Sequence, residues 1–232
     1  MNRHRPRALV CWSTGKDSAW ALHLLRSRDD VEVVGLLTTV NRAASRVAMH
    51  GVRERMLELQ AQALGLPLTR VPIPERCSNQ QYERAMAVAL GRAKSDGVSA
   101  VAFGDLYLED VRRYREEQLA AIGIEPLFPI WGRETADLAR EMIRAGLRAR
   151  LTCIDPKVLD PSFAGRTYDG ALIAALPEGV DPCGENGEFH TFAYRGPMFA
   201  KEIGVRGGAV VERGGFVFAD LQPADDSAAT GW

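Results

Sequence analysis

Short apolar runs alternate with segments of helical periodicity along the first part of the chain. Residues 8–12 form an almost continuous apolar run that stops at a polar cluster, which is typical of a buried parallel strand before a turn. Apolar positions then recur at helical spacing up to Arg28. The same alternation predicts strands at 31–39, 68–73 and 100–103, helices at 52–64, 79–95 and 108–122, and a fifth strand or extended segment at 125–131.

This alternation, with short connections, predicts an α/β protein with a doubly wound parallel five-stranded sheet. Ligands of such sheets bind at the carboxyl ends of the strands. Two helices also carry end signals. Ser78 and Gln81 predict a capping box before the helix at 79–95, and Gly65 predicts the end of the helix at 52–64.

After Trp131 the rhythm changes. The pattern predicts a helix at 134–145, a strand at 149–154, and then a stretch rich in Asp, Pro and Gly. Near the end, two apolar runs at 209–211 and 216–218, joined through 212–215, predict a hairpin. We therefore expect one domain at 1–132, a smaller α+β domain at 133–222, and a disordered tail at 223–232.

The composition narrows the class of protein. With 232 residues, 46% of them hydrophobic and 25% charged, the chain can bury a sizeable core. A formal net charge of −1 gives no general reason to expect nucleic acid or an anionic membrane as a partner. The four cysteines form no CxxC pair, and no signal-peptide core or membrane span can be drawn. We expect a cytoplasmic protein with reduced thiols. Its oligomeric state stays open, and a homodimer is one arrangement that the sequence allows.

The polar cluster after the first strand, Ser13-Thr14-Gly15-Lys16-Asp17-Ser18, has the features of a phosphate-binding turn. A strand-to-helix turn directs backbone N–H groups and the positive end of a helix at one point. Gly15 lets the backbone approach a ligand, the hydroxyl groups offer donors, and Lys16 adds a positive charge. Asp17 would repel phosphates unless a cation lies between them, which favours Mg²⁺ held by Asp17. A polar turn without any ligand is the alternative.

The loop does not match the Walker sequence G-x-x-x-x-G-K-S/T. Val10 stands where its first glycine would be, and Asp17 follows Lys16 in place of Ser or Thr. The loop instead resembles the S-x-G-K-D-S signature of the PP-loop ATP pyrophosphatases, within the adenine nucleotide alpha hydrolase superfamily. That resemblance implies a Rossmann-like fold and transfer of AMP to an acceptor.

A second segment, Gly184 to Phe192, resembles the G-E-x-G-E-F-H-T signature of the diphthine–ammonia ligase family. Other parts agree in order, namely Met49-His50-Gly51, Phe103-Gly104-Asp105, Pro126 to Gly132, and Glu141-Met142-Ile143 before Gly146. The resemblance runs from about Ala8 to Phe199. It implies an ATP-dependent conversion of a carboxylate to an amide with ammonium, through an acyl adenylate, with release of AMP and pyrophosphate.

The chain departs from the family at two places. The second loop position is usually glycine and is Thr14 here, which is tolerable if its φ angle is negative. Residues 108–116 and Asp181-Pro182-Cys183 resemble a bacterial branch of the family, for which the protein substrate of the family does not carry over. The acceptor, a small molecule or a protein side chain, therefore stays unknown.

The candidate site residues follow from the loop, the strand ends and the resemblance. We expect ATP at Ser13, Thr14, Gly15, Lys16, Asp17, Ser18, His50 and Gly104, substrate at Asp105, Arg112 and Asn186, and catalysis by Lys16, Glu185, Glu188 and His190. General acid–base work fits the last three, since ammonium must lose a proton before it attacks.

Several of these residues also have a plainer interpretation. His50 and Asp105 suit a surface loop and a strand-end turn. Glu185 and Glu188 can cap backbone N–H groups of a glycine-containing loop, and Arg112 can belong to a solvated helix face. Cys183 is either a nucleophile or structural.

Two other functions remain open from the sequence. One is a PP-loop RNA-modifying enzyme, which would need a basic surface and usually a cysteine pair. The other is a sensor that binds ATP or AMP without turnover.

Overall fold

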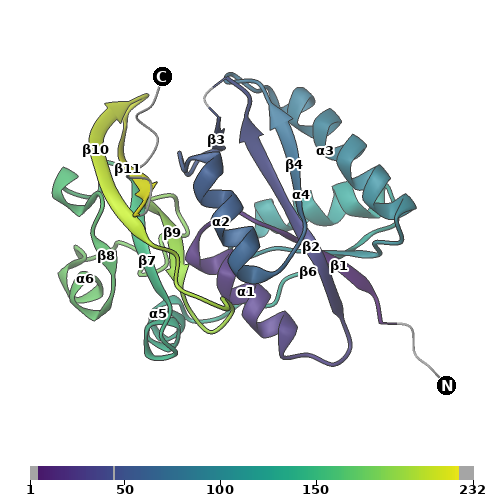
Figure 1. The fold of residues 1–232 in the computed structure, drawn as a ribbon, viewed down its shortest axis with the longest axis horizontal. Coiled ribbons are helices and arrows are strands. Elements are labelled where there is room, and N and C mark those ends of the chain that lie inside the picture. The colour runs from purple at the N-terminus through teal and green to yellow at the C-terminus, as the bar shows by residue number, and fades with distance from the viewer. Residues whose placement is uncertain (1–4, 44, 225–232) are drawn as a thin grey trace.

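The structure is a computed structural model that describes residues 5–43 and 45–224. Its first sheet contains five parallel strands in the order β4-β2-β1-β5-β6 (Figure 1). Their bounds are β1 Arg7–Cys11, β2 Glu32–Asn41, β4 Leu68–Ile73, β5 Ala100–Ala102 and β6 Glu125–Leu127. The predicted five-stranded parallel sheet is thus confirmed. A two-residue strand, β3 (Arg46–Val47), adds an antiparallel pairing with the end of β2 and is too short to leave a sequence pattern.

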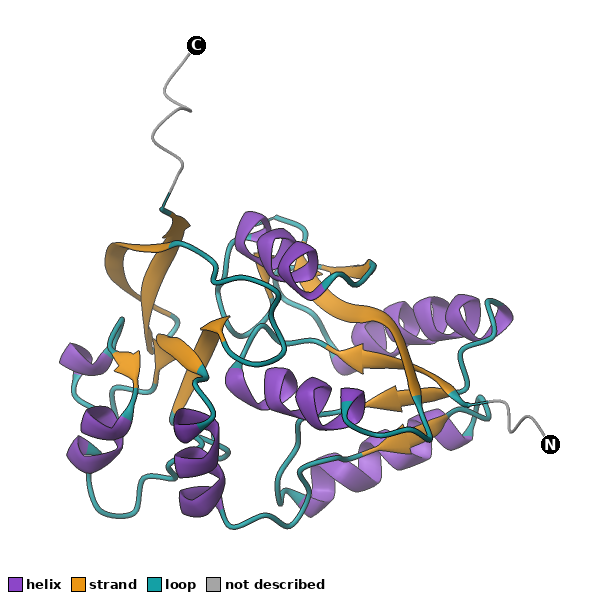
Figure 2. Cartoon of the chain, turned by 60° about the horizontal axis from the view of Figure 1, so that its bottom comes forward, coloured by secondary structure: helices purple, strands orange, loops and turns teal. Residues whose placement is uncertain are grey.

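Helices cover both faces of this sheet (Figure 2). They are α1 Lys16–Arg26, α2 Glu54–Leu64, α3 Asn79–Ser95 and α4 Glu109–Ala120. Consecutive strand residues point to opposite faces. Within β1, Ala8 and Val10 belong to the core formed with α1 and α2, whereas Leu9 belongs to the core that contains Leu90 of α3 and Leu119 of α4. The sheet is therefore doubly wound.

The two predicted helix ends, the capping box before α3 and the stop at Gly65 after α2, are confirmed. The backbone N–H of Gln81 donates to the Ser78 hydroxyl at 3.3 Å, and the Ser78 N–H donates to the Gln81 side chain at 2.9 Å. Gly65 ends α2 with a φ angle of 64°. The last strand, β6, is shorter than the segment 125–131, because the chain turns from Pro129 to reach Gly132 at a φ angle of 71°.

A second sheet is built entirely from antiparallel pairs around one central strand, β7 (Arg148–Ile154), which follows helix α5 (Thr135–Arg144). Its other strands are β8 Thr167–Tyr168, β9 Phe189–Arg195, β10 Val205–Arg213 and β11 Phe216–Pro223. A short 3-10 turn, η1 (Pro161–Phe163), and a short helix, α6 (Gly170–Ala175), lie in the Asp-, Pro- and Gly-rich stretch.

The predicted hairpin is confirmed as β10 and β11, joined by Gly214 and Gly215. Pro223, which we expected in the disordered tail, is the last residue of β11, and the N–H of Ala224 donates to Gly204 O at 3.1 Å. The rest of that tail, 225–232, lies outside the described residues. Among the helices that the structure describes, none has both the length and the apolar character needed to cross a membrane.

The two sheets meet through α1 and α2, which lie between them (Figure 1). Gln60 of α2 is fully buried at this junction. Its side-chain N–H group donates to Thr14 O at 2.9 Å and to Ala193 O at 2.6 Å, and its oxygen accepts from the Trp12 indole at 2.8 Å. One buried amide therefore joins the end of β1 to β9 of the second sheet.

Candidate active site

A cavity of about 530 Å³ opens at the carboxyl ends of β1, β2 and β5, where β9 approaches the first sheet. Its volume lies within the usual range for small-molecule sites. Nine of the residues expected from sequence line it, namely Ser13, Lys16, Asp17, Ser18, His50, Gly104, Asp105, Glu185 and His190. Thr14, Gly15, Arg112, Asn186 and Glu188 do not line it.

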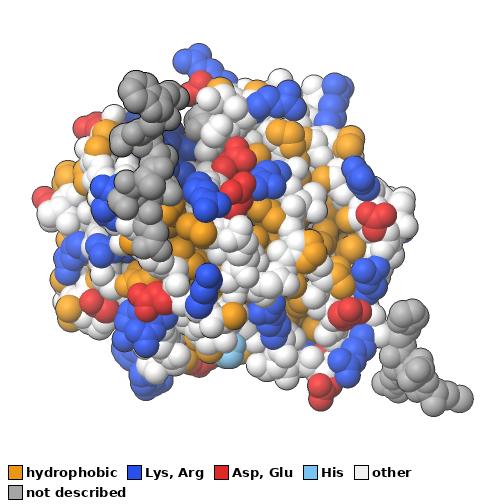
Figure 3. Space-filling view, in the orientation of Figure 1, with side chains coloured by type: hydrophobic (Ala, Val, Ile, Leu, Met, Phe, Trp, Pro, Cys, Tyr) orange, Lys and Arg blue, Asp and Glu red, His pale blue; other side chains and the backbone are white. Residues whose placement is uncertain are grey.

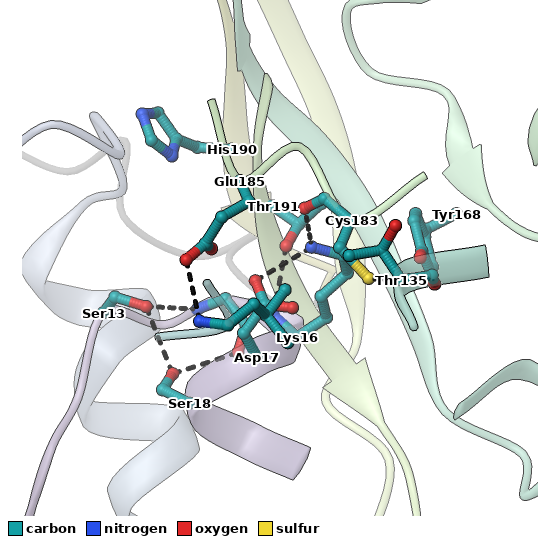
Figure 4. Close-up of polar contacts among 12 residues, drawn as sticks. Ser13, Lys16, Asp17, Ser18, Thr135, Tyr168, Cys183, Glu185, His190 and Thr191 are labelled. Carbon is teal, nitrogen blue, oxygen red and sulfur yellow. Dashed lines mark hydrogen bonds and ion pairs between the residues drawn. The ribbon is translucent and has the colours of Figure 1, made fainter. Parts of the chain in front are cut away.

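The loop at 13–18 is closed by its own hydroxyl groups (Figure 4). Ser13 Oγ accepts from Gly15 N at 3.3 Å and lies 3.1 Å from Ser18 Oγ, which donates to Gly15 O at 3.1 Å. Gly15 precedes the first residue of α1 and has no side chain to cap the helix, and the hydroxyl of Thr191 accepts from the first helical N–H, that of Lys16. The arrangement leaves the positive end of the helix directed at the cavity, which suits a phosphate.

Thr14 does not meet the condition of a negative φ angle under which it would be tolerable; its φ angle is 74°. A β-branched residue in the left-handed region is strained. Two hydrogen bonds to Thr14 O, from Gln60 and from the N–H of Ala193 at 2.9 Å, fix this conformation. Its hydroxyl oxygen is buried and has no hydrogen-bond partner among the described residues. The left-handed φ angle at position 14 explains why the family usually has glycine there. Thr14 adopts the same angle with strain.

Gly104, which follows β5, packs closely against the backbone of the loop. A Cβ atom built on Gly104 would lie 2.7 Å from Asp17 C and 2.7 Å from Ser18 N, closer than real contacts allow. Only glycine therefore permits the end of β5 to pack on the start of α1.

Lys16 lies almost fully inside, at 1% exposure. Its ammonium donates to Asp17 Oδ2 at 2.8 Å and to the carbonyl of Cys183, and it lies 5.3 Å and 5.4 Å from the ring centres of Tyr168 and Phe189. Burial lowers the pKa of Lys16, but Asp17, Cys183 and Asp181 together outweigh burial, and the pKa is raised. The Lys16 ammonium group thus keeps its positive charge, and it lies between the loop and the second sheet (Figure 4).

Asp17 has one oxygen available for a cation. Oδ2 accepts from Lys16, whereas Oδ1 is buried and has no hydrogen-bond partner among the described residues. Burial raises the pKa of Asp17 against the opposing pull of Lys16. No group of three or more His, Cys, Asp or Glu side chains that could hold a metal occurs in the described part of the chain. A Mg²⁺ ion usually needs only one or two carboxylates when phosphates complete its ligands, so Asp17 fits Mg²⁺ brought with ATP.

Glu185 enters the cavity from the segment before β9 (Figure 4). Its carboxylate accepts from Leu106 N at 2.7 Å, which fixes its position at the end of β5. Burial, with help from Asp17 and Asp105, raises the pKa of Glu185 to about 7. A carboxylate with this pKa can accept and release a proton at neutral pH.

Glu188 and Asn186 instead hold the loop together. Glu188 is 7% exposed, and one of its oxygens accepts from Asp181 N at 3.1 Å and from the Asn186 side chain at 2.9 Å. Its other oxygen is buried and has no partner among residues that the structure describes. These contacts position the segment that carries Glu185.

His190 lies on β9, one residue after the start of that strand. Its ring centre is 4.6 Å from that of His50, whose Nδ1 is 3.3 Å from Thr191 O. Burial lowers the pKa of His190 to about 4 and that of His50 well below its ordinary value. Both imidazoles are therefore neutral at pH 7, and both line the cavity.

Asp105 and Arg112, two of the three residues expected at the substrate, differ in their surroundings. Asp105 lines the cavity and forms an ion pair with Arg115, whose Nη2 lies 3.0 Å from Asp105 Oδ1. Arg112 pairs with Glu116 at 2.7 Å and stacks over Phe128 and Trp131, away from the cavity. Arg115, which the sequence did not single out, lines the cavity in its place.

Cys183 has the properties of a structural residue. It is 2% exposed, its thiol donates to Thr135 O at 3.4 Å, and burial raises its pKa to about 12. A nucleophilic thiol needs a depressed pKa. The structure gives no support to a sulfur-transfer role.

The sequence interpretation also missed Thr191, whose hydroxyl accepts from Lys16 N at 3.1 Å. Thr191 stood inside the Gly184 to Phe192 segment, so the signal was present without a role attached to it. Arg115 had a weaker signal, an arginine among many on a charged helix.

Comparisons with known proteins cover both halves of the site. A family model of the diphthamide synthase N-terminal domain matches residues 6–126, and a model of the diphthamide synthase C-terminal domain matches residues 134–217. The chain belongs to the diphthamide synthase family.

Curated relatives agree with this membership. The chain is 29% identical over 239 residues to the human diphthine–ammonia ligase, which covers 94% of this chain and 88% of the relative. It is 30% identical over 214 residues to the zebrafish (Danio rerio) diphthine–ammonia ligase, covering 82% and 83%. The mouse diphthine–ammonia ligase is 29% identical over 186 residues, covering 73% and 69%. This member of the diphthamide synthase family is an ATP-dependent, amide-forming ligase.

Proposed function

We propose that the chain joins ammonia to an organic carboxylate through an acyl adenylate, with AMP and pyrophosphate as products. The observation that carries this proposal is one cavity that contains both the phosphate-binding loop and Glu185, a carboxyl group whose burial raises its pKa to about 7. The name of the curated relatives, diphthine–ammonia ligase, gives their two substrates as diphthine and ammonia, and we use these by analogy. The acceptor of this chain is a carboxylate of that general kind.

In the first step, the ATP triphosphate lies on the Ser13 to Ser18 loop. An acceptor carboxylate oxygen attacks the α-phosphorus, the bond between the α-phosphorus and the bridging oxygen breaks, and pyrophosphate leaves. Lys16 and the N-terminus of α1 stabilise the charge that develops on the phosphates. Mg²⁺ held by Asp17 would supply further neutralisation of that charge when it is bound.

In the second step, Glu185 in its carboxylate form takes a proton from ammonium. The resulting ammonia attacks the acyl carbon, the carbon–oxygen bond to AMP breaks, and the amide and AMP form with release of one more proton. Asp105 and the neutral imidazole of His190 line the same cavity and can orient the acceptor. Glu188 and Asn186 position the segment that carries Glu185.

The formal net charge of −1 gives no general electrostatic reason to expect a nucleic acid as the acceptor. On the face shown in Figure 3, the Lys and Arg side chains are interspersed with Asp and Glu side chains. RNA binding is typically accompanied by a basic patch on one face.

A pyrophosphate-release screen tests the proposal. The protein is mixed with Mg²⁺-ATP, ammonium and a panel of carboxylic acids, and the nucleotide product is separated by chromatography. We expect AMP with at least one acid, and mass spectrometry should find the matching amide. ADP as the product, or no turnover with any acid despite tight ATP binding, would favour a different reaction or a sensor.

A further inference from the structure

A second cavity of about 520 Å³ lies beside the first. It is bounded by the end of β2, by β3, by residues 75–76 after β4, and by the turn of the β10–β11 hairpin. The two cavities adjoin, because they share a common wall formed by Val47, Ala48, Met49 and His190. A ligand in the second cavity therefore has a short path to the first.

The chain just after Met49 is packed directly on the hairpin. Gly51 has a φ angle of 65°, and a Cβ atom on it would lie 2.8 Å from the Phe218 ring. Met49, also in the left-handed region at 64°, is 72% exposed. The second sheet thus shapes the route between the two cavities.

The lining combines guanidinium groups with aromatic rings. Arg46 is neutralised by Asp220 at 3.0 Å, but Arg76 and Arg213 form no ion pair with any acidic side chain of residues 5–43 and 45–224. The Arg213 guanidinium stacks 5.4 Å above the Phe218 ring. Phe216 is half-buried, and Glu75 is the lining residue of opposite charge.

We propose that this second cavity binds the acceptor acid, with its carbon body against Phe216 and Phe218 and a second anionic group at Arg76 and Arg213. Guanidinium groups recognise carboxylates through paired N–H donors. The carboxylate that reacts then points past His190 toward the α-phosphorus. This inference rests on the proposed function and adds its substrate class, a small organic acid with a ring or other apolar body and two acidic groups.

Binding of two matched probes tests it without turnover. The protein is saturated with α,β-methylene-ATP, which cannot be cleaved at the α–β position, and titrated with phenylsuccinate or 3-phenylpropanoate in a calorimeter. Both probes carry one ring, but only phenylsuccinate has a second carboxylate. We expect phenylsuccinate to bind about tenfold more tightly.

Two variants and a control assign the site. Arg76→Ala and Arg213→Ala should each weaken phenylsuccinate binding about tenfold and leave 3-phenylpropanoate binding nearly unchanged. The control is Arg206→Ala, because Arg206 also lies on β10 but contacts Gln222 at 2.8 Å and lines neither cavity. It should bind both probes as the wild type does. Equal binding of the two probes, no binding of either, or equal losses in all three variants would overturn the assignment.

The same variants separate this inference from the proposed function. If an acid supports AMP release and its KM is unchanged in Arg76→Ala and Arg213→Ala, the acceptor binds elsewhere and the ligase proposal stands. If phenylsuccinate binds as expected but no acid in the screen yields AMP, the cavity assignment stands and the ligase reaction is wrong.

Discussion

The backbone N–H of Lys16 donates a hydrogen bond to the hydroxyl of Thr191 at 3.1 Å, so the first residue of α1 is held by β9 of the second sheet. These residues are far apart in sequence, and both are buried. The phosphate loop is therefore positioned partly by the second sheet. A substitution in the second sheet should therefore alter the position of the phosphate loop.

Thr191→Val should lower the free energy of unfolding by ~1–3 kcal/mol, because it leaves the buried Lys16 N–H without an acceptor. Urea unfolding measures the loss. Thr152→Val is the matched control, since Thr152 is equally buried but donates to the carbonyl of His190 at 3.3 Å. A backbone carbonyl that loses one donor costs less than an orphaned N–H. Equal losses of unfolding free energy in the two variants would show that the Lys16–Thr191 hydrogen bond contributes no more to stability than the Thr152–His190 hydrogen bond.

Gly104→Ala should weaken ATP binding at least tenfold while the protein remains folded. The added methyl group would lie 2.7 Å from the backbone at Asp17 and Ser18, so the loop must move. Isothermal titration with ATP and circular dichroism measure the two effects. Gly207→Ala is the control, because a Cβ at Gly207 meets no atom within 4 Å. Unchanged ATP affinity in Gly104→Ala would mean that the loop does not need this close packing.

At position 14, glycine should be more stable than alanine by ~0.5–1 kcal/mol, because only glycine tolerates a φ angle of 74° without strain. Position 91 should show the opposite order. Gly91 lies inside α3, and a Cβ there meets no atom within 4 Å, so Gly91→Ala should stabilise by ~0.5–1 kcal/mol. Thermal unfolding of Thr14→Gly, Thr14→Ala and Gly91→Ala gives the comparison. If Thr14→Ala is the more stable of the pair at position 14, the left-handed conformation there is wrong.

Glu185 should set the pH dependence of turnover. Its base form is needed, so kcat/KM should rise with pH through about 7 and then level off. Glu185→Gln should abolish that ionisation and lower kcat ~10²–10⁴-fold. Glu188→Gln, which keeps the oxygen that accepts from Asp181 and Asn186, should retain the rise near pH 7. A rise that persists in Glu185→Gln would assign the base to another group.

The same carboxyl affects stability. Its pKa is 4.5 in the unfolded reference and about 7 in the folded protein, so the folded state holds an extra proton between these values. The Glu185 contribution therefore favours folding below pH 4.5 and is lost as pH rises through about 7. The free energy of unfolding should fall more over this range in the wild type than in Glu185→Gln.

Local features of this protein could be predicted from its sequence because their causes lie within a few residues. The capping box of Ser78 and Gln81, the stop at Gly65 and the Ser13 to Ser18 loop each depend on neighbouring side chains. The φ angle of Thr14 could not be predicted, since it is fixed by Gln60 and Ala193 from distant elements.

The positions of several candidate site residues likewise depend on distant parts of the chain. Glu185 and Glu188 look alike in the sequence, yet the packing of Leu106 and Asp181 places one in the cavity and the other behind it. The choice between Arg112 and Arg115 likewise depends on which face of α4 meets Asp105. Such choices are set by tertiary contacts, which no short-range pattern records.

Isotope transfer tests the central claim, attack of a carboxylate on the α-phosphorus of ATP, most directly. Each acid that triggers nucleotide turnover is prepared with ¹⁸O in its carboxylate and incubated with the protein, Mg²⁺-ATP and ammonium, and the products are analysed by mass spectrometry. The account predicts that AMP carries one ¹⁸O atom and that pyrophosphate carries none. AMP without the label, or ADP in place of AMP, would contradict it.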